Sequence, residues 1–335
     1  MSETTMKENK MGILPIPKLL ISMSLPMILS MLVQALYNIV DSMFVAQLNE
    51  EALTAVSLVF PVQNLMIAVA AGTGVGINAL LSRSLGEKKY DKVNRIAQNG
   101  ILLGILSSLV FAVLGLIGSR LFFEAQTTDP EIIKYGTDYM LIITVASIGI
   151  FMQVTFERLM QSTGKTIFNM IIQGTGAIIN IIMDPILIFG WFGLPAMGIA
   201  GAAVATVIGQ WTGALLGLYF NEKHNPDVQF GRRYAKLDSK IVKAILVVGI
   251  PSIIMNSIGS VMNIGINKIL QGFTQYGEVP VAVFGIYFKL QSFIFMPVFG
   301  LNNGLIPVLA YNYGARNKQR IDEALKFSIS IAFAI

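Results

Sequence analysis

The sequence contains long runs without any charged residue, and these runs constrain the fold more than any other feature. Most of them reach the roughly 18 to 20 residues that an α-helix needs to cross a bilayer. The run 185–221 is too long for one helix, and Gly193 and Pro195 predict a break within residues 191–198. We therefore expect eight membrane spans and the beginning of a ninth. The uncharged runs are 19–40, 52–82, 96–119, 139–156, 166–183, 185–221, 244–267 and 290–315.

The composition fits a protein that lies within a lipid bilayer. Only 13% of the 335 residues are charged, compared with about 25% in soluble domains. The chain has no cysteine, so disulfides and thiolate metal sites are excluded, and its single His224 lies in a polar loop. We expect no cofactor and no nucleic-acid partner, and we expect a monomer.

The placement of the basic residues predicts the orientation in the membrane. Lysines and arginines cluster in residues 7–18, 83–95, 158–165, 223–243 and 316–326, whereas the alternate loops contain mainly glutamate and aspartate. The positive-inside rule places the basic loops, and with them the N-terminus, in the cytoplasm. We expect a multi-pass protein of the cell (inner) membrane.

The chain contains an internal repeat. The segments that begin at Leu25 and Ile250 match at an offset of 225 residues, and the helix that follows matches after a three-residue insertion. An even number of spans separates the two copies, which predicts a parallel repeat about an axis along the membrane normal. The matched pairs are Pro26 with Pro251, Asn38 with Asn263, Gly72 with Gly300, Gly76 with Gly304, and Gly86 with Gly314.

The predicted fold is an all-α polytopic membrane protein with a six-helix bundle and an incomplete second bundle. We expect a cytoplasmic N-terminal segment at 1–17, an N-lobe at 18–221, a cytoplasmic linker at 222–238 and a partial C-lobe at 239–335. Two bundles of six helices would make twelve, so we expect a C-terminally truncated chain. Gly72 and Gly76 have the spacing of a seam for close helix packing.

Two aspartates interrupt the apolar helices. With about 1.5 Å of rise per residue, Asp41 lies roughly 34 Å along its helix from Lys18, and Asp184 lies roughly 28 Å along another from Lys165. Asn180 is one turn before Asp184, and Thr206 reaches a similar depth on the sixth span. An unpaired carboxylate in hydrocarbon costs at least about 2.5 kcal/mol.

These four residues, Asp41, Asn180, Asp184 and Thr206, supply only oxygen-bearing side chains and suit a proton or a hard cation such as Na+. They are our candidate site for a coupling ion. The alternative is that Asp41 only caps the outer end of the first helix at the headgroups.

Several longer motifs resemble the multidrug and toxic compound extrusion (MATE) transporters. They are "SLPMILSMLVQALYNIVDSMFV", "GTGVGINALLSRSLGEKKYDK", "FERLMQSTGKT", "NIIMDPILIFG" and "GIAGAAVATVIGQ". The resemblance implies twelve helices around a central cleft and export of cationic or amphipathic drugs in exchange for Na+ or H+. It also implies that Asp41 is the first-helix acid and that Pro26 is the hinge of that helix.

Other residues are candidates for the substrate cleft: Tyr37, Asn38, Met255, Lys289 and Gln291. Lys289 either faces the cleft or snorkels to the interface. Glu157 is placed by helix rise at the cytoplasmic end, where we expect a solvated acid or one beside Arg158. Two other functions remain open, a flippase of lipid-linked sugars or polysaccharide and, more remotely, an intramembrane aspartyl protease.

Overall fold

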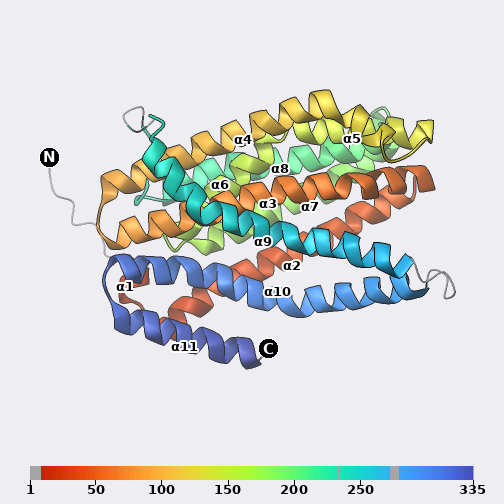
Figure 1. Ribbon diagram of the computed structural model, residues 1–335. Coiled ribbons are helices and arrows are strands. Elements are labelled where there is room, and N and C mark those ends of the chain that lie inside the picture. Colours follow the sequence, from red (N-terminus) through yellow and green to blue (C-terminus); the bar gives the residue numbers. More distant parts are fainter. Residues whose placement is uncertain (1–8, 232–233, 235, 272–278, 335) are drawn as a thin grey trace.

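The computed structural model describes residues 9–231, 234, 236–271 and 279–334. These residues form long helices that run side by side and are joined by short loops (Figure 1). The helices are α1 (Lys10–Ile13), α2 (Ile16–Ala46), α3 (Glu50–Gly86), α4 (Tyr90–Glu124), α5 (Pro130–Val145), α6 (Ile148–Ser162), α7 (Thr166–Phe189), the 3-10 turn η1 (Trp191–Gly193), α8 (Ile199–His224), α9 (Ser239–Gln271), α10 (Val279–Gly314) and α11 (Lys318–Ala334).

The number of spans agrees with the prediction. Among the described residues, seven helices are long and apolar enough to cross a membrane, and the bent pair α5 and α6 makes an eighth. The predicted break between the fifth and sixth spans is also present, because α7 ends at Phe189 and α8 begins at Ile199. Gly190 ends α7 with a φ of 75°, a left-handed conformation that glycine adopts without strain.

The fourth span differs from the continuous helix that its sequence suggested. It is broken between α5 and α6, which meet at an angle of 44°. Ser147 lies at the break and donates a hydrogen bond from its hydroxyl to the carbonyl oxygen of Ser108 at 3.2 Å. Gly149 follows two residues later, and serine and glycine together are a common cause of a sharp kink.

The internal repeat is visible in the packing. A Cβ atom on Gly72 would lie 2.4 Å from Ile253, and one on Gly300 would lie 2.4 Å from Ile28. These two contacts are equivalent under the repeat, since both glycines and both isoleucines are matched positions. The second helix of each half therefore packs closely on the first helix of the other half, α3 on α9 and α10 on α2.

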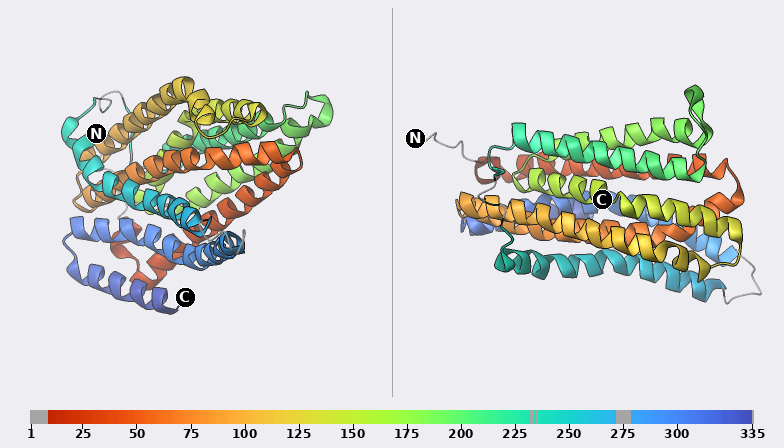
Figure 2. Two further views of the ribbon diagram at one scale, coloured as in Figure 1. Left: turned by 45° about the vertical axis from the view of Figure 1, so that its right-hand side comes forward. Right: turned by 90° about the horizontal axis from the view of Figure 1, so that it is seen from above.

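The same symmetry recurs where α3 and α10 end. A Cβ atom on Gly86 would lie 2.0 Å from the carbonyl oxygen of Tyr311, and one on Gly314 would lie 2.1 Å from that of Arg83. Only glycine permits such an approach of one backbone to another. The helices α9, α10 and α11 lie along one flank of the bundle made by α2 to α8 (Figure 2). The all-α fold with a parallel repeat is confirmed.

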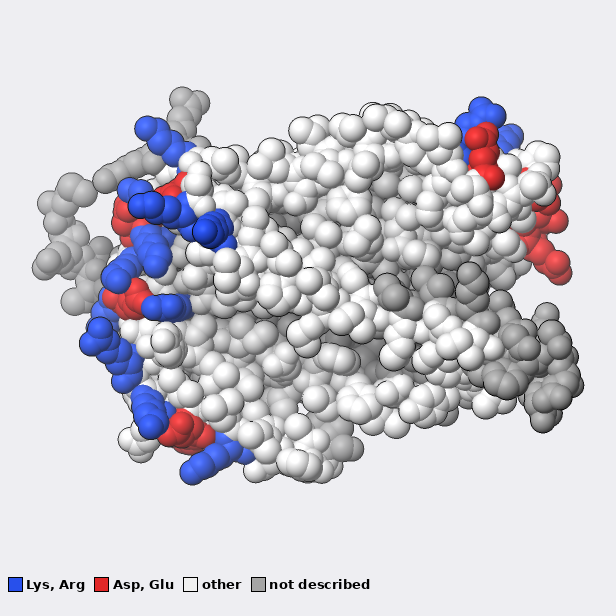
Figure 3. All heavy atoms as spheres, in the orientation of Figure 1, with Lys and Arg blue, Asp and Glu red and all other residues white. Residues whose placement is uncertain are grey.

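Charged side chains gather at the two ends of the bundle and leave its middle apolar (Figure 3). We call the end that holds the α3–α4 and α10–α11 loops the basic end, because most lysines and arginines lie there. The other end, which we call the far end, includes η1 and the loop 125–129. One of its basic residues, Arg120, is paired with Glu124 at 2.7 Å.

Candidate functional site

The two intramembrane aspartates come from helices far apart in sequence and meet inside the N-terminal half. Asp41 lies near the far end of α2, and Asp184 lies in the last turns of α7. Their carboxyl groups are neighbours that interact directly with one another. Asp184 is fully buried, and so is the Oδ1 atom of Asp41. Two ionised carboxylates repel at this range, so the pair requires a shared proton or a cation.

The two other predicted ligands lie in the same cluster. The Nδ2 atom of Asn180 donates to Asp184 Oδ1 at 3.4 Å and to Thr206 Oγ1 at 3.4 Å. Three buried oxygens of the cluster have no hydrogen-bond partner among the described residues: Asp41 Oδ1, Asn180 Oδ1 and Asp184 Oδ2. A buried acceptor without a donor is costly, and a proton or an oxygen-coordinated cation would satisfy these atoms.

A cavity of about 180 Å³ extends from this cluster along the inside of the bundle. Tyr37, Asn180 and Thr206 line it at one end, and Glu157 and Arg158 contribute the charged side chains of its wall. The remaining polar wall consists of amides and a hydroxyl, from Ser30, Gln34, Gln153, Gln173, Gln210 and Asn303. Among the described residues, the wall of this cavity therefore combines apolar and polar side chains without an excess of positive charge.

The position of Glu157 corrects the expectation of a solvated acid. Its side chain is only 4% exposed and accepts hydrogen bonds from Gln153 Nε2 at 3.0 Å and Gln173 Nε2 at 2.9 Å. Arg158 follows it in sequence but points to other partners, Gln161 Oε1 at 2.7 Å and Asn303 Oδ1 at 3.3 Å. Glu157 is thus a buried carboxylate facing the cavity.

Pro26, the predicted hinge, is buried in the first half of α2. A proline has no backbone N–H, so the carbonyl oxygen four residues earlier, on Ser22, loses its helical partner. The hydroxyl of Thr166, at the start of α7, donates to that oxygen at 3.3 Å. The proline site of α2 is therefore joined directly to the helix that carries Asp184.

A family model for MatE matches residues 26–186 and 251–335. The chain belongs to the MatE family. Members of this family are transporters, so the chain is a multi-pass membrane transporter and not an enzyme. The resemblance seen in the sequence motifs is confirmed, and the protease alternative is excluded.

Curated relatives and solved structures in the MatE family cover nearly the whole chain. The multidrug export protein MepA of Staphylococcus haemolyticus (strain JCSC1435) is 29% identical over 322 residues, which make up 95% of this chain and 70% of MepA. A multidrug resistance MATE transporter in an outward-facing conformation has a TM-score of 0.91 at 27% identity, covering 99% of this chain and 72% of that one.

A second solved structure is described by its binding pocket. It is a MOP superfamily transporter from Pyrococcus furiosus Vc1 (DSM3638), for which a pocket of reverse polarity suggests a different function. Its TM-score is 0.90 at 27% identity, and the match covers 99% of this chain and 72% of that chain.

Two tyrosines surround the aspartate pair of this MatE protein. Tyr37 was predicted as a cleft residue, but Tyr139 was missed. The hydroxyl of Tyr139 accepts a hydrogen bond from Gln63 Nε2 at 3.1 Å and also contacts Thr206. Its ring is almost fully buried. A tyrosine hydroxyl buried in hydrocarbon needs a hydrogen-bond partner. A tyrosine within an apolar span was therefore the signal in the sequence that pointed to a polar neighbour.

The structure does not place the other predicted cleft residues at the cavity. Asn38 is exposed, and Met255 is 74% exposed on α9. Gln291 is partly buried on α10 and does not line the cavity of the N-terminal half. The side chain of Lys289 lies outside the described residues.

Proposed function

We propose that this MatE protein is a secondary active multidrug efflux transporter that exchanges cationic or amphipathic compounds for Na+ or H+. The observation that carries the proposal is the buried pair Asp41 and Asp184, with Asn180 and Thr206 beside it. The unpartnered oxygens of this cluster are acceptors for the coupling ion. MepA, a relative over nearly the whole chain, is named a multidrug export protein.

The drug and the ion are proposed to use adjoining parts of one space. Asn180 and Thr206 belong both to the ion cluster and to the cavity wall. Occupation of the cluster by a cation therefore changes the polarity and shape of the adjoining end of the cavity. In this way the bound cation alters the affinity of the cavity for the drug. The carboxyl group of Glu157 lies in the wall of the same cavity and is proposed to face a cationic drug.

Pro26 is proposed to let α2 bend when the cluster changes its occupant. α2 carries both the proline and Asp41, and α7 carries both Asp184 and the Thr166 hydroxyl that contacts the proline turn. A change in the distance between the two aspartates is thereby transmitted to the bend. The charge segregation of Figure 3 supports a cytoplasmic basic end and a cytoplasmic N-terminus in the cell membrane.

The membrane potential can drive export of a neutral compound, because one elementary charge that moves inward through 100 mV supplies about 2.3 kcal/mol and supports a concentration ratio of roughly 50-fold. Exchange of a monovalent cationic drug for one Na+ or H+ moves no net charge, so that export is driven by the concentration gradient of the coupling ion. A flippase of lipid-linked sugars is less well supported, because it needs cations for phosphate. The only cation lining this cavity among the described residues is Arg158, which is bonded to Gln161 and Asn303.

The test is ethidium efflux from vesicles under separately imposed Na+ and proton gradients. We expect one of the two gradients to drive efflux and the variants Asp41→Asn and Asp184→Asn to abolish it. The matched control is Asp138→Asn, an exposed aspartate on α5 of the same half, which should transport normally. Unchanged efflux in the double variant of the two buried aspartates would refute the proposal.

A further inference from the structure

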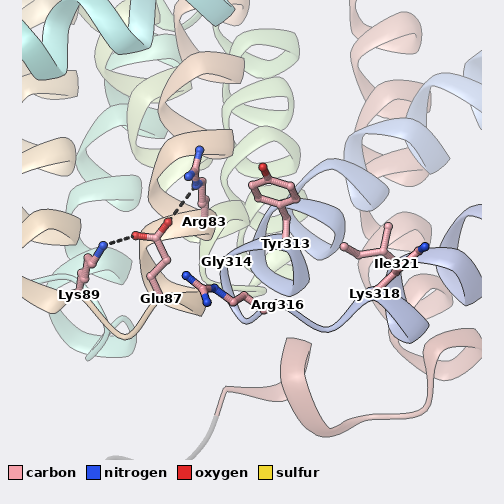
Figure 4. A pocket seen from close by; sticks show the side chains of 8 residues that line it. All are labelled: Arg83, Glu87, Lys89, Tyr313, Gly314, Arg316, Lys318 and Ile321. Carbon is pink, nitrogen blue, oxygen red and sulfur yellow. Dashed lines mark hydrogen bonds and ion pairs between the residues drawn. The ribbon is translucent and has the colours of Figure 1, made fainter.

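A second and larger cavity, of about 780 Å³, lies at the basic end and is separate from the transport cavity. Its walls come from both halves of the repeat. The end of α3 and the following loop contribute Arg83, Glu87 and Lys89, and the end of α10 and its loop contribute Tyr313 and Arg316 (Figure 4). Lys318, the first residue of α11, completes the charged lining.

The positive charge in this cavity is only partly neutralised. Glu87 is the one carboxylate that the described residues place in its lining, held between Arg83 at 2.9 Å and Lys89 at 2.8 Å. The hydrogen bond from Lys89, with a further one from Arg83, lowers the pKa of Glu87, so this group is ionised at neutral pH. Four cations therefore face one anion, and the side chains of Arg316 and Lys318 have no ion-pair partner in the described parts of the chain.

One of these cations also contacts an aromatic ring of the other half. The guanidinium of Arg83 stacks over the ring of Tyr313, 5.1 Å from its centroid, which joins the two halves across the cavity. In Figure 4 the side chain of Arg316 extends from the α10–α11 loop toward the side where Glu87 lies. Two guanidinium groups and two ammonium groups around one space match the several oxygens of a phosphate group.

We propose that this cavity binds a phosphate-bearing anion between the two halves of the transporter. The phosphate is presented either by the headgroup of an anionic phospholipid or by a free phosphate. The exposed ring of Tyr313 and the side chain of Ile321 give the cavity an apolar edge, which suits a headgroup at the membrane surface.

The bound anion has a consequence for conformation. The cavity exists because α3 and α10 approach closely, with Gly86 against the Tyr311 carbonyl and Gly314 against that of Arg83. An anion that contacts both walls binds only while these ends are together. By mass action it stabilises the arrangement that closes the basic end.

The experiment is a thermal unfolding titration of the purified chain in detergent at fixed ionic strength. The three additions are dioleoylphosphatidylglycerol, dioleoylphosphatidylcholine and inorganic phosphate. The pocket variant is Arg316→Gln with Lys318→Gln. The matched control is Lys240→Gln with Lys243→Gln, two exposed lysines on α9 at the same end.

We expect an anionic addition to raise the Tm of the wild type and of the control more than phosphatidylcholine does. Each basic residue near a phosphate surface contributes about fivefold in affinity, and the pocket variant lacks two of them. It should therefore bind the anion roughly 30-fold more weakly. Stabilisation by phosphatidylglycerol alone assigns the lipid headgroup, and stabilisation by inorganic phosphate as well assigns a free anion.

Two results would overturn the proposal. One is a wild type that no anion stabilises beyond phosphatidylcholine. The other is an equal loss of stabilisation by the anion in the pocket and control variants, which would show that the anion responds only to the overall positive charge of this surface. If the double pocket variant does not fold, the single variant Lys318→Gln is titrated in its place and must still bind more weakly than the wild type.

Discussion

Replacement of Glu157 by glutamine should distinguish cationic from neutral substrates. The carboxylate faces the transport cavity and is fixed by the amides of Gln153 and Gln173. Glutamine keeps the shape of the side chain and an acceptor oxygen but removes the charge. The variant therefore changes the electrostatics of the cavity with little change in its volume.

The size of the effect follows from the burial of the carboxylate. A unit charge pair about 5 Å apart, at an effective dielectric constant of about 20, interacts by roughly 3 kcal/mol. This corresponds to a loss of affinity on the order of 100-fold for a monovalent cation. A neutral compound of similar size should lose almost nothing, because the hydrogen-bonding and apolar parts of the wall are retained.

The assay is binding of ethidium and of a neutral amphipathic dye to the purified protein, each measured by fluorescence titration. The matched control is Glu222→Gln, an exposed glutamate on α8, which should leave both affinities unchanged. Equal weakening of the cationic and the neutral dye in Glu157→Gln would refute the assignment of Glu157 as the cation-attracting group.

Two stability predictions concern the contacts between helices. Thr166→Val removes the hydroxyl that donates to the Ser22 carbonyl and should lower stability by about 1 kcal/mol, whereas Thr166→Ser, which keeps the hydroxyl, should remain close to wild type in a thermal unfolding scan. Gly86→Ala would place a Cβ atom 2.0 Å from the Tyr311 carbonyl oxygen, so it should cost about 1–3 kcal/mol. Gly118→Ala, whose Cβ meets no atom within 4 Å, is the control. Equal Tm values within either pair would contradict the packing described here.

The sequence predicted that the residues of the candidate site share one level along the bundle. Helix rise alone placed Asp41 and Asp184 at a common level, and the structure brings their carboxyls together. The spacing of Gly72 and Gly76 predicted a seam for close helix packing, and the contacts of Gly72 with Ile253 and of Gly76 with Ile245 agree. Position along a helix and an internal repeat can both be read from the order of residues, because the rise per residue of a helix is known.

The sequence predicted less well which way a helix faces. Glu157 was expected to be solvated or to lie beside Arg158 because it is near a helix end, but the rotation of α6 turns it into the cavity toward Gln173 of α7. Gln153, one turn earlier on the same face, was a local signal of a polar lining. Tyr139 was missed because its partners, Gln63 and Thr206, lie on two other helices.

In the proposed exchange, Asp41 and Asp184 hold the ion that the drug displaces. This is tested by measuring the release of cation when ethidium binds to the purified protein, followed with a Na+-selective electrode and a pH dye. We expect ethidium to release Na+ or H+ from the wild type and from Asp138→Asn, and to release neither from the double variant Asp41→Asn with Asp184→Asn. The same cation release from the double variant would contradict it.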